Sequence, residues 1–308
     1  MTASEFTPAY ARTGADTVAD RAAELREMMR SCRLCPRNCA VDRLAGEQGL
    51  CGVGAEPIVS SYGPHFGEEA PLVGRRGSGT IFLNFCNLKC IFCQNYDISH
   101  LGRGRPTSPR RLAQMMLELQ RTGCHNINWV TPTHQSPMLI EATRIALADG
   151  LRVPIVYNCG GYESVEVLRL LEDIVDIYMP DAKYGDNDIG RRLSGVPDYW
   201  DRCREALAEM HAQVGDLAVD DQGIARRGLL VRHLVLPEDM AGTRTIMDYL
   251  ASLSPHTYVN VMAQYRPAHR AREVPEIARP ITTIEFRRAL QAAADAGLHR
   301  LDERWQLR

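Results

Sequence analysis

Three cysteines lie close together in the segment 86–97, CNLKCIFCQNYD, as Cys86, Cys90 and Cys93 with the spacing CxxxCxxC. A structural zinc site takes four ligands, and disulfides need an even number of cysteines. Three thiolates in one loop therefore favour a metal centre with one open coordination position, such as a [4Fe–4S] cluster. The alternatives are a zinc ion completed by a distant histidine, and three cysteines that only pack.

A second group of cysteines precedes this loop. It consists of Cys32, Cys35, Cys39 and Cys51, with the spacing C-x2-C-x3-C-x11-C. Four thiolates can close a tetrahedral site and leave no position for a substrate. Zinc would make the site structural, a second [4Fe–4S] cluster would make it an electron relay, and a third alternative is that only some of the four bind. The dispersed cysteines are expected to be small buried apolar residues: Cys124, Cys159 and Cys203.

Composition limits the classes of protein that this chain can be. Its 308 residues are 45% hydrophobic and 24% charged, which is ordinary for a globular protein. A formal net charge of −2 argues against a broad surface for nucleic acid or anionic membrane. The first thirty residues lack an apolar signal-peptide centre, and no apolar run of about 18 residues is present. We expect a cytoplasmic protein, whose cysteines bind metal rather than form disulfides.

From residue 79 onward, apolar strand-like segments alternate with amphipathic helical ones, which predicts a parallel sheet with right-handed crossovers. The expected strands are 79–85, 126–131, 153–159, 174–180, 229–237 and 257–263, with a short one near 298–301. The expected helices are 108–123, 136–150, 164–173, 198–214, 243–253 and 282–296. Six such units are two short of a closed eight-stranded barrel. We therefore predict an α/β fold with an open, partial (β/α)6 barrel and its chemistry at the carboxyl ends of the strands.

The region before residue 79 has a different character. Residues 17–31 place Val18, Ala22, Leu25 and Met29 on one face of a helix, and 32–78 are rich in glycine and turns. We predict an N-terminal helix and a Cys-rich, metal-binding region over 1–78, followed by a core over 79–308. The polar residues of HFGEEAPL could cover the site or finish a hairpin, and we expect the hairpin: His65, Glu68 and Glu69.

The stretch GTIFLNFCNLKCIFCQNYDIS, residues 79–99, resembles the cysteine loop of radical S-adenosylmethionine (SAM) enzymes. Over about residues 32–270 the chain is similar to proteins related to pyruvate formate-lyase-activating enzymes, above all to their PflX-type branch. The segments that carry this likeness are CRLCPRNCAVDR, HFGEEAPL, HNINWVTPTH, IVYNCGGYE, DIYMPDAKY and RHLVLP. The resemblance implies a radical SAM barrel, with a [4Fe–4S] cluster and SAM as cofactors.

The resemblance also implies a reaction. Cys86, Cys90 and Cys93 would bind three irons of the cluster, and the amino and carboxylate groups of SAM would chelate the fourth. Reductive cleavage would give methionine and a 5′-deoxyadenosyl radical that abstracts hydrogen from a substrate, the work of an oxidoreductase. Phe92 would lie near the adenine. The electron donor would be a protein such as flavodoxin or ferredoxin, and the substrate would be either a glycine of a partner protein or a small molecule.

Further SAM contacts are expected where strands end. Relatives usually carry Gly-Gly-Glu after the second strand, but this chain reads TPTHQSP, which puts the contact to the SAM amino group in doubt. Thr133, His134 or Gln135 could replace it, and His134 is our candidate. After the third strand, Asn158 could bond a hydroxyl beside Gly160 and Gly161, although a simple turn explains the glycines as well.

The fourth and fifth strands supply charged candidates. Asp181 and Lys183 resemble the DxK element of activating enzymes, in which the lysine would bind the SAM carboxylate and the aspartate a cation or peptide. The alternative is a solvated salt bridge. Arg232 and His233 alternate faces, so one of them can point into the barrel, and we select Arg232. The mouth could be lined by Gln264, Tyr265 and Arg266.

Two other functions compete with radical chemistry. A two-cluster electron-transfer protein without SAM chemistry would explain both cysteine groups, but it does not need six strand–helix units. A zinc-dependent binding module would explain the N-terminal cysteines. The absence of a basic stripe argues against nucleic acid as its target. We expect neither a nucleic-acid nor a membrane partner.

Overall fold

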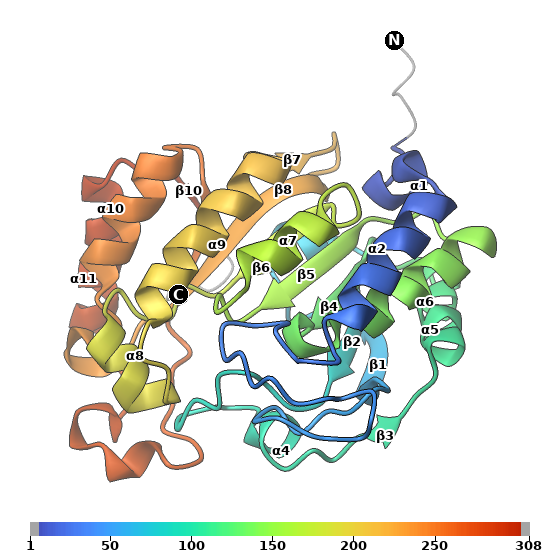
Figure 1. Ribbon diagram of the computed structural model, residues 1–308. Coiled ribbons are helices and arrows are strands. Elements are labelled where there is room, and N and C mark those ends of the chain that lie inside the picture. The colour runs from blue at the N-terminus through green and yellow to red at the C-terminus, as the bar shows by residue number, and fades with distance from the viewer. Residues whose placement is uncertain (1–5, 303–308) are drawn as a thin grey trace.

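A curved sheet with helices on its outer face forms the body of the molecule in the computed structural model, which describes residues 6–302 (Figure 1). The order of the strands is β10-β9-β8-β6-β5-β4-β2-β1-β3, and β7 pairs with β8. The strands are β1 Ile58–His65, β2 Ser78–Leu83, β3 Arg105–Pro106, β4 Ile127–Val130, β5 Ile155–Cys159, β6 Ile177–Pro180, β7 Ala218–Val219, β8 Ala225–Leu234, β9 Tyr258–Met262 and β10 Arg300–Leu301.

The six predicted strands correspond to β2, β4, β5, β6, β8 and β9, and each pairs in parallel with the next. The short β10 adds a further parallel strand beside β9, as expected near 298–301. The path through the described strands has two ends, so the barrel is open. The predicted α/β fold with a partial barrel is therefore confirmed, and the carboxyl ends of its parallel strands share one edge.

Helices connect the strands as the alternation predicts. They are α1 Ala9–Thr13, α2 Ala15–Glu27, α3 Ala70–Val73, α4 Tyr96–Ser99, α5 Pro109–Arg121, α6 Ser136–Ala148, α7 Val165–Leu171, α8 Asn187–Ser194, α9 Tyr199–Val214, α10 Thr243–Leu253 and α11 Thr283–Asp295, with 3-10 turns η1 Thr133–Gln135, η2 Pro237–Asp239, η3 Ala271–Glu273 and η4 Pro275–Ile277. At the start of α5, the Ser108 hydroxyl accepts from the Arg111 amide at 3.2 Å, which caps the helix as expected. Sequence analysis missed α8, a short helix that Asp186 caps and Gly195 ends.

Alternate residues of each strand face opposite sides of the sheet. Trp129 and Tyr157 pack among the helices in the main core. Val156, Met179 and Leu230 lie on the other face and form a second cluster with Leu72 of α3. Leu72 belongs to the connection between β1 and β2, so this connection fills the inside of the barrel with an apolar side chain.

The N-terminal region packs directly on the barrel. Helix α2 lies against α6 and α7, and its residues Val18, Ala22 and Leu25 are buried as expected. The pairing expected of a hairpin is present, because β1 pairs antiparallel with β2 from Val59 to His65, but Glu68 and Glu69 do more than finish it, since both are buried beside Arg232. The division of the chain at residue 78 stays a proposal. No helix within residues 6–302 is long and apolar enough to cross a membrane.

In Figure 1 the blue loop after α2 and the teal loop that leads to α4 lie at the same end of the sheet. These two loops carry the two groups of cysteines. The fold therefore brings both groups to the edge where parallel strands end, and their separation in sequence hides their proximity in space.

Candidate metal and cofactor site

The loop after β2 forms one wall of a cavity of about 140 Å³ that we call the strand-end cavity. Its walls include all three cysteines of the CxxxCxxC loop. Opposite them lie residues from the carboxyl ends of β2, β4, β5, β6 and β8. The structure thus brings together these predicted site residues: Cys86, Cys90, Cys93, Asn158, Asp181, Lys183 and Arg232.

The cysteine loop has an unusual backbone. Phe85 and Lys89 have φ angles of 66° and 59°, in the left-handed region that residues other than glycine seldom occupy. The Lys89 ammonium group donates to the Ser99 carbonyl at 3.0 Å and lies 5.1 Å from the centre of the Phe85 ring. Such strain persists where surrounding contacts hold it, and it is common where a ligand is bound.

Each of the three sulfurs has a hydrogen-bond donor. The Ser194 hydroxyl donates to Cys90 Sγ at 3.0 Å, and the Leu88 amide donates to Cys86 Sγ at 3.4 Å. Ser99 Oγ lies 3.1 Å from Cys93 Sγ. A metal-bound thiolate can only accept, so Ser99 would be the donor there. Because donors to sulfur stabilise the thiolate form, the chemistry of this loop fits a thiolate-bound cluster.

Burial affects the protonation of these thiols. It raises the pKa of Cys86 to about 12, and the neighbouring Cys90 adds to the effect. The pKa of Cys93 is raised by the same two causes. The thiols of Cys86 and Cys93 are therefore neutral without a cation, and metal binding must release their protons. Within residues 6–302, no three His, Cys, Asp or Glu side chains are placed to hold a single metal ion.

Asp181 is held between two cations. Arg232 Nε donates to Asp181 Oδ1 at 2.8 Å, and Lys183 Nζ donates to Asp181 Oδ2 at 2.5 Å. Burial opposes ionisation of this carboxyl group, but Arg232 and then Lys183 outweigh it and lower its pKa. The side chains of Asp181 and Lys183 are only 16% and 19% exposed, so the pair is not the solvated salt bridge of the alternative interpretation. Arg232 Nη2 also donates to Asn158 Oδ1 at 2.7 Å.

Arg232 also lies near two carboxylates of the β1–β2 connection. Its guanidinium is 3.7 Å from Glu68 Oε2 and 4.0 Å from Glu69 Oε1. Burial raises the pKa of Glu69 to about 7 although Arg232 opposes the shift. The neighbouring His233 points to the other face, where its ring nitrogens bond to the Ala182 carbonyl and the Thr243 hydroxyl. The predicted alternation of faces on this strand is present, with Arg232 inside.

Phe92 and the segment after β9 lie beside the cysteine loop. The Phe92 ring is 5% exposed and makes edge contacts with Tyr184 and Tyr265, at centroid distances of 6.2 and 5.9 Å. It is not among the residues that line the strand-end cavity, so its contact with adenine stays a prediction. Gln94 donates to the Gln264 carbonyl at 3.2 Å, which ties the two segments together.

The sequence placed His134 among the SAM contacts, but the structure places it in a different cavity. Thr131 has a φ of 62°, and η1 then turns the chain away from the strand-end cavity. His134 Nε2 lies 2.9 Å from the Asn84 carbonyl, and its ring lines the cavity of the N-terminal cysteines. Burial lowers its pKa to about 3, so the ring is neutral.

Two residues near this site were not recognised from the sequence as functional. Cys159, expected to be a packing residue, is buried but lines the strand-end cavity. Behind it lies Glu163, whose two oxygens accept from the Thr133 hydroxyl at 2.8 Å and the Tyr157 hydroxyl at 3.0 Å. The only signal was the segment NCGGYE, in which an acid follows two glycines after a strand.

Glu163 should make the stability of the fold depend on pH. Burial raises its pKa from 4.5 to about 7, a difference that corresponds to roughly 3 kcal/mol. Because the folded-state pKa is the higher one, this stability is present below pH 4.5 and is lost as the pH rises through 7. Glu163→Gln should flatten the pH dependence of thermal unfolding between pH 5 and 8, whereas the exposed control Glu172→Gln should not. If the unfolding temperature changes equally with pH in the wild type and in Glu163→Gln, Glu163 does not cause the pH dependence.

The two glycines after β5 should respond differently to substitution. Gly161 has a φ of 79°, and an added Cβ would lie 2.3 Å from the Asp181 carbonyl oxygen. At Gly160 the tightest contact, 2.6 Å, is to the flexible end of Leu88. Gly161→Ala should lower the free energy of unfolding by more than about 2 kcal/mol, because it combines strain with a backbone clash. Gly160→Ala is the matched control and should have the smaller effect in denaturant titrations. An equal loss of stability in both variants would contradict the explanation by backbone strain and clash at Gly161.

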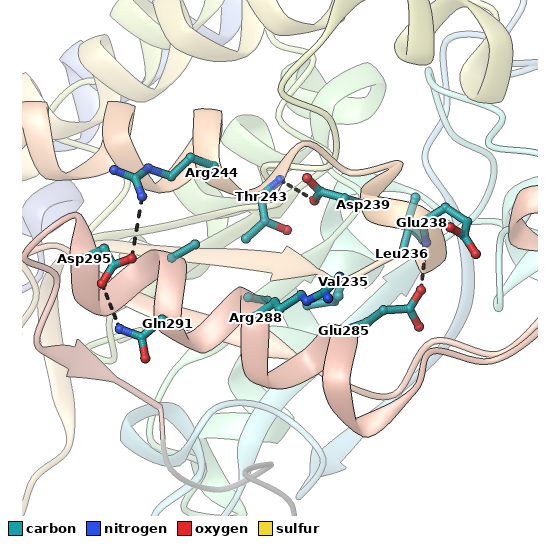
Figure 2. Close-up of a pocket in the computed structure, with 12 residues that line it drawn as sticks. Val235, Leu236, Glu238, Asp239, Thr243, Arg244, Glu285, Arg288, Gln291 and Asp295 are labelled. Atoms are coloured by element: carbon teal, nitrogen blue, oxygen red, sulfur yellow. Dashed lines mark hydrogen bonds and ion pairs between the residues drawn. The ribbon is translucent and has the colours of Figure 1, made fainter.

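A further cavity, of about 500 Å³, lies between η2, α10 and α11 (Figure 2). None of the predicted site residues lines it. Some of its polar side chains bond to groups of other lining residues. Asp295 accepts from Gln291 at 2.7 Å and lies 3.7 Å from Arg244, and Asp239 accepts from the Thr243 amide at 3.1 Å. This cavity has no element in common with the cysteine loops.

Comparisons with known proteins agree with the site. The family model described as the radical SAM superfamily matches residues 80–219. An uncharacterized protein of Methanocaldococcus jannaschii is 33% identical over 278 residues, which cover 87% of this chain and 75% of that protein.

Two solved structures resemble the fold more distantly. Methylornithine synthase shares 14% identity with a TM-score of 0.46, over 73% of this chain and 71% of its own. HydG, a maturase of the [FeFe]-hydrogenase, shares 10% identity with a TM-score of 0.48, over 93% of this chain and 63% of its own. At these identities and TM-scores, the two structures give no information about the activity of this chain.

Proposed function

Because this chain belongs to the radical SAM superfamily, we propose that it is an enzyme that cleaves SAM reductively and transfers the radical to a substrate by hydrogen abstraction. The family implies a [4Fe–4S] cluster and SAM as cofactors. One observation carries the proposal. The three cysteines of the CxxxCxxC loop line one cavity with the charged strand-end residues Asp181, Lys183 and Arg232.

The residues of the strand-end cavity fit these cofactors. Cys86, Cys90 and Cys93 would hold the cluster, which would supply the electron that breaks a carbon–sulfur bond of SAM. Lys183 and Arg232 could bind the carboxylate of SAM through their positive charges. That carboxylate would compete with Asp181, which now pairs with both side chains.

The remaining roles concern orientation. Asn158 can bond a ribose hydroxyl, and Phe92 can pack near the adenine. Ser99 and Ser194 hold the sulfurs in place by hydrogen bonds. The protein thus orients the cofactors and excludes water, while the cofactors carry the difficult bond cleavage.

The finer assignment rests on the resemblance to the PflX-type branch. We infer a protein related to pyruvate formate-lyase-activating enzymes, with either a glycine of a partner protein or a small molecule as its substrate. A flavodoxin or ferredoxin would supply the electron. The reducing cytoplasm, where thiols remain free for metals, is the compartment that suits this chemistry.

We also infer that the N-terminal cysteines bind zinc or a second [4Fe–4S] cluster. The support is that Cys32, Cys35, Cys39 and Cys51 all line one cavity. Sets of four cysteines hold either centre.

Formation of 5′-deoxyadenosine tests the proposed function. The full chain is reconstituted with iron and sulfide without oxygen, reduced with dithionite and given SAM. Chromatography with mass detection should then find 5′-deoxyadenosine and methionine in a one-to-one ratio. A protein that only transfers electrons, or a zinc-binding module, would form neither.

A further inference from the structure

The cysteines of the N-terminal region line one small cavity, which we call the four-cysteine cavity: Cys32, Cys35, Cys39 and Cys51. Cys32, Cys35 and Cys51 are buried, and Cys39 is half-buried. The loop closes on itself, because the Ala40 amide donates to the Cys32 carbonyl at 3.1 Å. Thiols gathered in this way are the preferred ligands of zinc and of iron–sulfur clusters.

A buried cation lies beside this cavity. Arg43 is 0% exposed, and it donates to the Gly54 carbonyl at 2.8 Å and lies 3.9 Å from Cys32 Sγ. In the described part of the chain it forms no ion pair with a carboxylate. A buried charge needs a partner of opposite sign. A metal centre held by four thiolates has a net negative charge, so it would supply that partner.

One of the residues that line the four-cysteine cavity has an unpartnered nitrogen. His134 lines it, and the ring is 1% exposed. The Asn84 carbonyl can only accept, so Nε2 at 2.9 Å must carry the hydrogen. The other nitrogen, Nδ1, is buried and has no hydrogen-bond partner within residues 6–302. Since a neutral imidazole with Nε2–H has a lone pair on Nδ1, this atom is available to a metal centre.

We propose that the four-cysteine cavity is a second metal centre, with thiolate ligands, Arg43 as its buried counter-ion and His134 Nδ1 in contact with it. Zinc and a [4Fe–4S] cluster share this ligand chemistry, although zinc would require the thiols to move closer together, because no three of them in residues 6–302 are placed to hold a single ion. The centre does not depend on SAM cleavage, so it can be tested in a chain that has lost the first cluster.

The second centre is built against the back of the CxxxCxxC loop. Arg37, between Cys35 and Cys39, donates to the Asn87 carbonyl at 2.8 Å and the Leu88 carbonyl at 3.0 Å. It also donates to the carbonyls of Ser194 and Gly195, at 3.0 and 2.7 Å. These bonds fix the backbone between Cys86 and Cys90, and also the residue that donates to Cys90. The metal therefore braces the loop of the first cluster.

Metal analysis of the full chain with Cys86, Cys90 and Cys93 all replaced by alanine tests the proposal. One sample is reconstituted with iron and sulfide, and another is loaded with zinc. After desalting, we expect about four irons with sulfide, or about one zinc, per chain. The element that is retained identifies the centre. This variant keeps all four N-terminal cysteines. A chain that nevertheless retains neither metal would overturn the proposal.

Further variants in the same background locate the metal. Cys35→Ser with Cys51→Ser should reduce the bound metal at least tenfold, whereas the control pair Cys124→Ser with Cys203→Ser should retain it. Retention of metal by the first pair would place the metal elsewhere and contradict the proposal. Circular dichroism shows whether each variant is folded.

The parts played by His134 and by the brace have their own readouts. His134→Gln keeps an amide donor for the Asn84 carbonyl but removes Nδ1. It should shift the visible spectrum of the centre, recorded with cobalt in place of zinc if the site takes zinc. An unchanged spectrum would remove His134 from the site.

In the otherwise wild-type chain, loss of Cys35 and Cys51 should speed amide hydrogen exchange in residues 84–93 at least tenfold. Unchanged exchange there would contradict the brace.

Discussion

Cys90→Ala is expected to abolish 5′-deoxyadenosine formation, with a loss of at least about a thousandfold. The cluster is held by only three thiolates, and two cannot retain it. Cys90 is buried and accepts from Ser194, so no neighbouring sulfur can move into its place without repacking α8. The measurement is the yield of 5′-deoxyadenosine per chain after anaerobic reconstitution, together with iron content.

Cys124→Ala is the matched control for this loss. Cys124 is also buried, but it lies in the connection between α5 and β4 and is not among the residues that line the two cysteine cavities. Its replacement should leave the yield within about twofold of wild type. A Cys90→Ala enzyme with normal yield would mean that the electron enters SAM from some other centre.

Arg232→Met is expected to destabilise the fold by roughly 3–5 kcal/mol, because it removes the cation from buried carboxylates. Asp181 would retain Lys183, but Glu69 is only 4% exposed and would lose its nearby positive charge. Methionine replaces most of the apolar stem of the arginine side chain and adds no charged group. Denaturant titration at pH 7 measures the loss.

The pH dependence of Arg232→Met separates charge from packing. Burial already raises the pKa of Glu69 to about 7, and without Arg232 it should rise further. A raised carboxyl pKa removes stability as the pH increases, so the variant should lose more stability at pH 8 than at pH 5.

Adding Glu69→Gln to Arg232→Met provides the control. The double variant should recover about half of the loss at pH 8, because the buried negative charge is gone. An equal loss at pH 5 and 8, unaffected by Glu69→Gln, would show that Arg232 acts through packing alone.

Much of the barrel could be predicted because strands covered by helices are simple apolar runs. The pattern of Ser-Pro at the start and Gly at the end located α5 and α6 within about two residues. The alternation of faces predicted that one of Arg232 and His233 points into the barrel, and the structure shows that it is Arg232. Helix α8 was missed because it is only eight residues long and mostly polar, so that its apolar spacing rests on Ile189 and Leu193 alone. Tertiary contacts, which a local pattern does not contain, hold it against the cysteine loop.

The candidate site was predictable where one motif carries the chemistry and not where distant segments meet. Cys86, Cys90 and Cys93 share a loop, so their spacing was sufficient. The four-cysteine cavity is partly closed by His134, which follows Cys51 by more than eighty residues in sequence. The left-handed Thr131 turns the chain toward that cavity, and no propensity scale predicts this for a threonine. Ser194 was hidden for the same reason, since its role depends on a contact across the fold.

The electron-spin signal of the reduced cluster tests the central claim most directly. The full chain, reconstituted without oxygen and reduced with dithionite, is measured before and after SAM is added. Direct binding of SAM to the iron that no cysteine holds should change the g-values of the signal. The variant with Cys35→Ser and Cys51→Ser should show the same change, in proportion to the amount of cluster that remains bound at Cys86, Cys90 and Cys93. A reduced [4Fe–4S] signal that SAM leaves unaltered would contradict this assignment of the site.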